Sequence, residues 1–219
     1  MRVKQAIGER GSLRWIQTLV DAHRPIADAA LRDALELVPE ITVDWRSPLR
    51  IDAYAEYRDS DFLERVGLGD LRSTLGAFWP RGGPQWDALA RLSDGRIILV
   101  EAKAHTKELR SHCTASPASR QTIEAALALA RRHFGAPDSA DWTRDYYQYA
   151  NRLAHLYFLR THGVDAQLVF FYFLNDTDME GPTSTAEWTV ALADVHRTLG
   201  IAGPIANVHE CFVDTRQLA

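Results

Sequence analysis

Apolar residues recur at helical spacing near the start of the chain. Leu13, Ile16 and Leu19 follow one another at intervals of three, and a second set of this kind follows Pro25. Such a period is typical of an amphipathic helix that packs one face against a core. The pattern therefore predicts helical structure over residues 12–38, interrupted at the proline.

Further along, short apolar stretches with strand character alternate with longer helical patterns. We expect an extended piece at 41–45, a short helix capped by Asp59 or Ser60 and closed by Gly67, strands at 86–92 and 96–104, helices at 119–134 and 142–160, a strand at 166–174, a helix at 185–199 and a last strand at 205–213. Residues 166–174 are apolar almost throughout, which suits a strand covered on both faces. This order predicts an α/β fold with a central mixed sheet flanked by helices.

The length of 219 residues fits a single compact domain. Within it, we expect residues 1–48 to form an N-terminal helical annex and residues 49–219 to form the α/β core. No apolar run reaches the length of about 18 residues that a membrane-spanning helix needs, so no membrane partner is expected.

Two neighbouring predicted strands form a hairpin whose register decides which charged side chains meet. Alternate residues of a strand point to the same face, so Glu101 and Lys103 are neighbours about 6.6 Å apart. A two-residue loop would turn Asp87 to the opposite face, whereas a three-residue loop at 93–95 places it opposite Glu101. The sequence allows both registers. We expect the longer loop, because Gly95 supplies the positive φ that it needs.

In the register with the longer loop, two carboxylates and an ammonium group converge. The oxygens of Asp87 and Glu101 are hard ligands that suit Mg²⁺ or Mn²⁺. Such an ion lowers the pKa of a bound water and stabilises charge on a phosphoryl group. Lys103 is placed to orient the attacking water and to balance charge in the transition state. The pattern therefore indicates metal-dependent hydrolysis of a phosphoester.

The order of these residues resembles the PD-(D/E)XK nuclease superfamily, to which restriction endonucleases belong. Asp87 is followed, after thirteen residues, by Glu101-Ala102-Lys103 at the end of an apolar strand. The resemblance covers roughly residues 50–175 and implies a restriction-endonuclease-like core. It implies Asp87 and Glu101 as metal ligands, the backbone carbonyl of Ala102 as a further ligand, and Lys103 as the catalytic lysine. The proline of the family name is absent here.

The same resemblance implies two further contributions to the site. An acidic residue ahead of the hairpin often joins the metal ligands, and both Glu56 and Glu64 are candidates. We favour Glu56, since Glu64 suits the solvated face of a short helix. A polar residue from a following helix often lies beside the metal, and Gln148 resembles that element as a catalytic residue. The alternative for Gln148 and its polar neighbours Arg152 and His155 is an ordinary solvated helix face.

Charge and cysteine content limit the range of functions. A net charge of −4 counts against a protein that coats nucleic acid non-specifically, because such binding uses many basic contacts. Cys113 and Cys211 are the only cysteines, too few for a disulfide framework, so we expect reduced thiols in a cytoplasmic protein. The spacing of His105, His112 and Cys113 matches no zinc pattern.

The sequence thus favours a Mg²⁺- or Mn²⁺-dependent nuclease that hydrolyses phosphodiester bonds in nucleic acid, preferentially DNA. The alternative is a catalytically inactive nuclease-fold module that binds nucleic acid or a protein partner. Strandedness, sequence preference, endonucleolytic or exonucleolytic mode and oligomeric state stay open. A homodimer that cuts both strands and a partner protein that supplies targeting are both compatible with the sequence.

Overall fold

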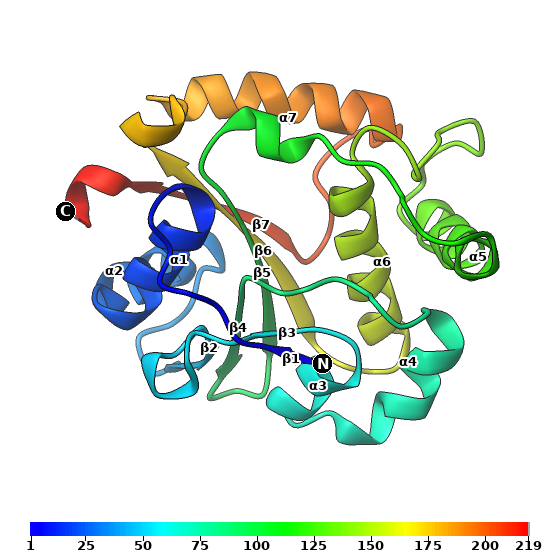
Figure 1. Ribbon diagram of the computed structural model, residues 1–219, viewed down its shortest axis with the longest axis horizontal. Coiled ribbons are helices and arrows are strands. Elements are labelled where there is room, and N and C mark those ends of the chain that lie inside the picture. Colours follow the sequence, from blue (N-terminus) through cyan, green and yellow to red (C-terminus); the bar gives the residue numbers. More distant parts are fainter. Residues whose placement is uncertain (219) are drawn as a thin grey trace.

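Five strands form the central sheet of the computed structural model, which describes residues 1–218 (Figure 1). In spatial order they are β2 (Val43–Ser47), β4 (Ala88–Leu92), β5 (Ile97–Lys103), β6 (Ala166–Leu174) and β7 (Val208–Asp214). The pairs β2–β4 and β4–β5 are antiparallel, whereas β5–β6 and β6–β7 are parallel. The predicted fold class, a mixed sheet flanked by helices, is confirmed.

Helices cover both faces of this sheet. One face packs against α1 (Gly11–Asp21) and α2 (Arg24–Ala34), and the other against α5 (Pro117–His133), α6 (Tyr147–Thr161) and α7 (Thr185–Leu199). The short helices α3 (Ser60–Arg65) and α4 (Arg72–Phe78) lie at the lower edge in Figure 1. Residues 1–48 therefore contribute both helices of one layer and also the edge strand β2.

A small second sheet joins the start of the chain to the region of the hairpin. It consists of β1 (Arg2–Val3) and β3 (Glu56–Tyr57), which pair antiparallel. Tyr57 also forms an antiparallel bridge to Trp86, just before β4, and its carbonyl accepts the N–H of Trp86 at 3.0 Å. Because of this bridge, the chain before Asp87 pairs with β3 and not with β5. Strand β3 therefore lies next to the open end of the hairpin, where β4 begins and β5 ends.

Side-chain alternation along β5 divides the two halves of the core. Ile98 and Val100 lie in the cluster beneath α1 and α2, whereas Ile97 and Leu99 lie in the cluster beneath α5, α6 and α7. The strand is buried at every position, as its run of apolar residues predicts. Glu101 lies on the same face of β5 as Ile97 and Leu99, so its carboxylate points toward α6 rather than toward solvent.

The β4–β5 hairpin has the three-residue loop at 93–95, in which the glycine has a φ of 96°. Ala88 pairs with Val100, and the position one step further along both strands places Asp87 opposite Glu101. The predicted register is confirmed. It follows from local chemistry, because a glycine in the left-handed region is what closes a loop of this length.

Several predicted boundaries shift. Helix α6 begins at Tyr147 rather than at 142, because Trp142 is held outside it by an indole N–H that donates to the carbonyl of Leu199 at 2.9 Å. Ser116 rather than Ser119 caps α5, since the Ser116 hydroxyl accepts the N–H of Ser119. Helix α4 was not predicted, because Leu75 is its one buried residue and leaves no apolar period to detect.

Other elements lie where the apolar pattern predicts them. Strand β6 and helix α7 have the expected bounds, and α7 ends at Gly200, whose φ of 72° is typical of a helix C-terminus. Cys113 and Cys211 are buried free thiols. Within residues 1–218 no helix has both the length and the apolar character needed to cross a membrane.

Candidate active site

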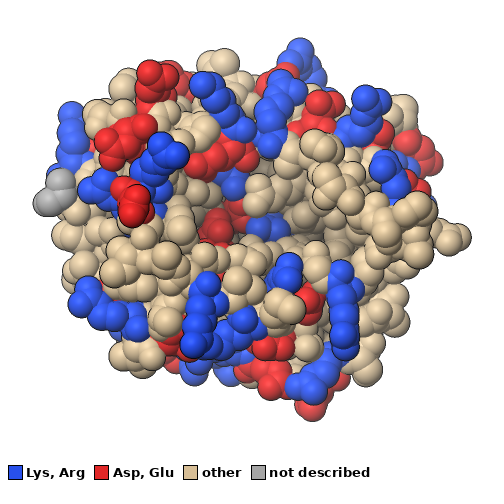
Figure 2. All heavy atoms as spheres, in the orientation of Figure 1, with Lys and Arg blue, Asp and Glu red and all other residues tan. Residues whose placement is uncertain are grey.

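A pocket of about 330 Å³ opens beside the end of the β4–β5 hairpin. Its lining comes from β3, the loop before β4 and the first half of α6: Glu56, Trp79, Gly82, Gly83, Pro84, Gln85, Asp87, Tyr147, Gln148, Asn151 and Arg152. Figure 2 shows a hollow in the middle of this face, next to α6, with acidic and basic side chains side by side at its bottom. The hairpin residues thus meet helix α6 in a concave region.

Glu101 lies beneath this pocket and is only 1% exposed. Its Oε2 accepts from Nε of Arg152 at 2.6 Å and lies 2.5 Å from Nη2, while Lys103 forms an ion pair with Oε1. Burial opposes the ionisation of Glu101, but the two cations outweigh burial and hold the pKa of this carboxyl below its usual value. Glu101 is therefore a buried carboxylate with a cation on each oxygen.

Asp87 is partly buried at the edge of the same cluster. Its Oδ2 accepts the N–H of Ala102 at 2.7 Å, and its Oδ1 has no hydrogen-bond partner among residues 1–218. Burial, and next the charge of Glu101, raise the pKa of Asp87 well above its usual value, with Lys103 acting in the opposite direction. Asp87 thus presents one oxygen without a protein partner to the pocket, in surroundings that disfavour a further negative charge.

The carbonyl of Ala102 lies on the Asp87 side of β5. The N–H and C=O of one strand residue point to the same side, and this N–H reaches Asp87. Strand β4 no longer pairs there, because the chain before Asp87 turns to β3. The Ala102 carbonyl, which the resemblance implies as a metal ligand, is therefore adjacent to the carboxylate of Asp87.

Of the two upstream acidic candidates, Glu56 is the one at the pocket. It is 5% exposed, and its Oε2 accepts hydrogen bonds from Gln5 at 2.9 Å and from Gln85. Burial raises the pKa of Glu56 above its usual value. Glu64 is exposed on α3 and forms an ion pair with Arg72. The bridge between β3 and the segment before β4 explains the difference, since it brings Glu56 to the hairpin.

Helix α6 contributes more to the pocket than its polar stripe indicates. Gln148 is half-buried in the lining, and its N–H donates to the hydroxyl of Ser111 at 2.8 Å. A solvated face is the wrong interpretation for Asn151, Arg152 and His155, all of which are buried. The helix lies between the sheet and helices α4 and α5, so its polar residues face the interior of the protein.

Arg152 is the residue of this candidate site that the sequence did not indicate. Besides Glu101, its guanidinium donates to the carbonyl of Gln85 at 2.7 Å and to Oδ1 of Asn151 at 2.9 Å, and it lies 4.9 Å from the ring centroid of Trp86. These contacts fix its orientation. The one signal in the sequence is its position four residues after Gln148, which places both side chains on one side of the helix.

Histidines contribute no base to this pocket. Burial lowers the pKa of His155 to about 3, so the ring is neutral, and it packs against the rings of Phe62, Trp79 and Trp86. Nowhere in residues 1–218 do three His, Cys, Asp or Glu side chains form a group that holds a metal ion by themselves. A metal at the hairpin would therefore use Asp87 and Glu101 together with backbone or water oxygens.

Comparisons of the chain with protein-family models, with curated proteins and with solved structures found no match. The resemblance to PD-(D/E)XK nucleases therefore stays a prediction from the hairpin motif. The functional interpretation of the pocket rests on its geometry and chemistry.

Proposed function

We propose that this protein is a metal-dependent nuclease with Asp87, Glu101 and Lys103 as its active site. The observation that supports the proposal is that Asp87 and Arg152 line one pocket, while Glu101 and Lys103 are buried behind this lining, with Glu101 paired to both Arg152 and Lys103. Buried charges are costly, and buried carboxyls with perturbed pKa values in a cleft are concentrated at functional sites. A purely structural hairpin has no need for such a cluster.

The donors at this pocket fit a hard divalent cation. Asp87 has one oxygen without a protein partner, the negative charge of this carboxylate is disfavoured by burial and by Glu101, and a cation would reduce that penalty. The carbonyl of Ala102 lies on the same side, and Glu101 can join when Lys103 leaves its Oε1. When bound, Mg²⁺ or Mn²⁺ supplies a water of lowered pKa and stabilises charge on the leaving oxygen.

The protein's own groups would position the reactants. Lys103, released from Glu101, donates to the attacking water and neutralises charge that develops on the phosphoryl oxygens. Arg152 is a positioning residue that holds the Glu101 carboxylate in place through its contact with Oε2. Gln148 presents its amide to the pocket, where it can donate to a phosphate oxygen. Hydrolysis breaks one P–O bond and adds the oxygen of water to phosphorus.

The test is incubation with single-stranded, linear duplex and closed circular DNA in Mn²⁺, in Mg²⁺ or in EDTA. We expect cleavage only with a divalent ion, and its loss in Asp87→Ala and Lys103→Ala. Arg132→Gln, an exposed position on α5 outside the pocket, is the control and keeps wild-type cleavage. Cleavage that is absent with every substrate, or unchanged in both active-site variants, contradicts the proposal.

A second candidate function is a binding module without turnover. It is favoured by the engagement of both Glu101 oxygens by Lys103 and Arg152, which leaves Glu101 no oxygen for a metal ion unless one of these pairs opens. Calorimetry separates the two candidates. A nuclease binds Mn²⁺ and loses this binding in Glu101→Gln, whereas a non-catalytic module binds nucleic acid and gives no heat with Mn²⁺.

A further inference from the structure

Two more pockets adjoin the catalytic pocket along helix α6. One, of about 490 Å³, shares Trp79 with the catalytic pocket and is also lined by Arg81 and by His155 of α6. The other, of about 740 Å³, is lined by Arg144, just before α6, and by Ser111. The catalytic pocket shares Trp79 with the first of these pockets, and its lining residue Gln148 donates its N–H to Ser111 of the second, so the catalytic pocket adjoins both.

Unpaired cations lie in both outer pockets. Arg81 and Arg144 are exposed, and neither has an ion-pair partner in the part of the chain that the structure describes. Figure 2 shows Lys and Arg side chains above and below the central hollow. In the middle pocket, by contrast, Arg152 is already engaged by Glu101. Each outer pocket also has carboxylates, Asp59 and Asp61 in one and Asp141 and Asp145 in the other, so the unpaired arginines, and not a net positive charge, are the groups that would contact the phosphates of a polyanion.

The depth of the catalytic groups limits the form of that polyanion. Glu101 is 1% exposed and Lys103 7%, beneath a pocket of about 330 Å³, which is the lower end of the range for small-molecule sites. One nucleotide fits such a space. An intact duplex is stiff over many base pairs and cannot lower one phosphate into it, whereas a single strand bends at each nucleotide. The half-buried ring of Tyr147 offers a face for an unstacked base.

Building on the proposed function, we infer that the substrate is a single strand of nucleic acid that runs along α6 through all three pockets. Arg81 contacts a phosphate on one side of the cleaved bond, and Arg144 contacts a phosphate on the other side. The strand continues in both directions, so cleavage needs no free end. A basic groove with aromatic faces is the usual way in which proteins hold single strands without reading their sequence.

Binding in EDTA tests the path of the strand without cleavage. Fluorescence anisotropy compares a labelled single-stranded oligonucleotide with the same sequence as a duplex. We expect tighter binding of the single strand. Arg81→Gln and Arg144→Gln each weaken this binding several-fold and lower the slope of log Kd against log salt by about 0.7, the value for one phosphate contact. Arg132→Gln makes the same charge change outside the three pockets and leaves both quantities unchanged.

Equal or tighter binding of the duplex overturns the inference, as does wild-type binding by both arginine variants. Cleavage with Mn²⁺ adds a second test: circular single-stranded DNA is opened and closed circular duplex stays intact. If linear DNA is shortened and the single-stranded circle survives, the continuous path is wrong while the proposed nuclease stands. If no nucleic acid is cut, the proposed nuclease is wrong, and the anisotropy measurements decide the strand path by themselves.

Discussion

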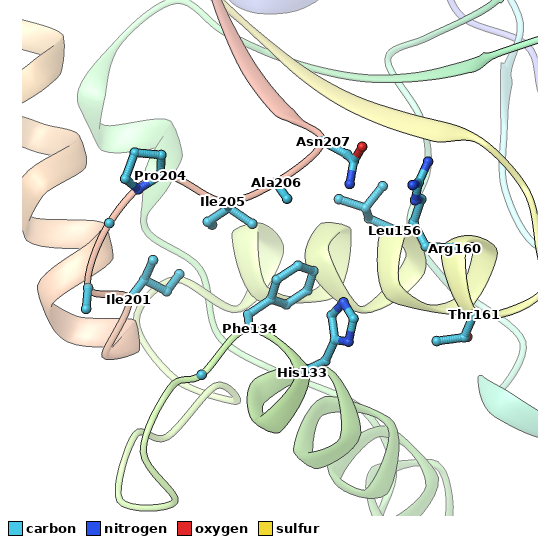
Figure 3. A pocket seen from close by; sticks show the side chains of 13 residues that line it. His133, Phe134, Leu156, Arg160, Thr161, Ile201, Pro204, Ile205, Ala206 and Asn207 are labelled. Atoms are coloured by element: carbon cyan, nitrogen blue, oxygen red, sulfur yellow. The ribbon is translucent and has the colours of Figure 1, made fainter.

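The two ends of the central sheet carry pockets of very different character. At the start of β6 and β7 lies a pocket of about 650 Å³, into which Phe134, Leu156, Ile201 and Ile205 project (Figure 3). At the carboxyl end of β5 lies the proposed catalytic pocket, with about half that volume. The larger pocket is lined mostly by apolar groups, whereas the smaller one is lined by Glu56, Asp87 and Arg152, with Glu101 and Lys103 buried behind them.

The two ends differ more in how deeply their charged side chains are buried than in the volume of their pockets. In the larger pocket, Arg160 forms an ion pair with Asp165 in which both side chains keep much of their exposure, 34% and 58%. In the smaller one, the pair of Arg152 and Glu101 is 3% and 1% exposed. Ligands of open α/β sheets bind beyond the carboxyl ends of the strands, and the buried charges lie at that end. Buried, paired charge therefore distinguishes the end of the sheet at which we propose the active site.

The largest expected effect is on cleavage. Lys103→Ala removes the ammonium that orients the water, and we expect kcat/KM on a single-stranded substrate in Mn²⁺ to fall by about 10²–10⁴-fold, the typical contribution of such a group. Phe134→Ala, which truncates a side chain of the larger pocket, leaves kcat/KM per folded molecule unchanged. Comparable losses in the two variants would remove the functional distinction between the two ends.

The next effect is on stability, and it compares two arginines of the same helix. Arg152→Ala leaves the Glu101 carboxylate buried with one cation fewer, so we expect the free energy of unfolding to fall by about 3–5 kcal/mol. Arg160→Ala removes a partly exposed ion pair and costs about 1 kcal/mol or less. Chemical denaturation measures both. Arg152→Lys keeps the charge and recovers part of the loss, and similar losses for Arg152→Ala and Arg160→Ala would contradict the comparison.

A smaller effect follows from the raised pKa of Asp87. An acid whose pKa is raised by folding is stabilising in its protonated form, so without metal the stability falls as the pH rises from the usual aspartate range through the raised pKa. Asp87→Asn removes this penalty, and we expect its Tm at neutral pH to exceed that of the wild type. About 1 kcal/mol shifts Tm by about 2–4 °C in a chain of this size, which a thermal melt resolves.

Two measurements check the origin of that gain. The excess Tm of Asp87→Asn should disappear at low pH, where the wild-type carboxyl is protonated, and Mn²⁺ should raise the Tm of the wild type alone. Cleavage by the wild type should increase over the pH window in which its stability decreases, because a metal ligand must be ionised. A lower Tm for Asp87→Asn at neutral pH would show that its carboxylate is not disfavoured.

The smallest effect concerns the loop that sets the register. Gly95 has a φ of 96° and nothing within 4 Å of an added Cβ, so Gly95→Ala strains only the backbone, and we expect a loss of about 1 kcal/mol. At the same end of the sheet, in the loop before β7, Gly203 has equally open space and no positive φ, so Gly203→Ala is neutral or stabilises by about 0.4–1 kcal/mol. Denaturation curves of the two variants should therefore shift in opposite directions or, for Gly203→Ala, not at all.

Patterns among neighbouring residues were enough to predict much of the fold and part of the candidate site. The all-apolar run of β6 and the capped, glycine-ended α7 were predictable because burial and helix termination leave marks on neighbouring residues. Strand alternation also predicted that Glu101 and Lys103 share a face, whereas the position of Asp87 depended on the loop length, for which the sequence allowed two registers. Helix α4, with a single buried leucine, left no such mark.

By itself the sequence determined the α/β class, the hairpin and the three charged side chains at its end, because each depends on residues close together along the chain. Only the tertiary structure decided that Arg152 of α6 neutralises Glu101, that Glu56 rather than Glu64 reaches the pocket, and that three pockets follow one helix. Those contacts join segments about 30 to 50 residues apart in sequence. Which residues form these contacts depends on how the helical layers pack on the sheet, and no local sequence pattern specifies that packing.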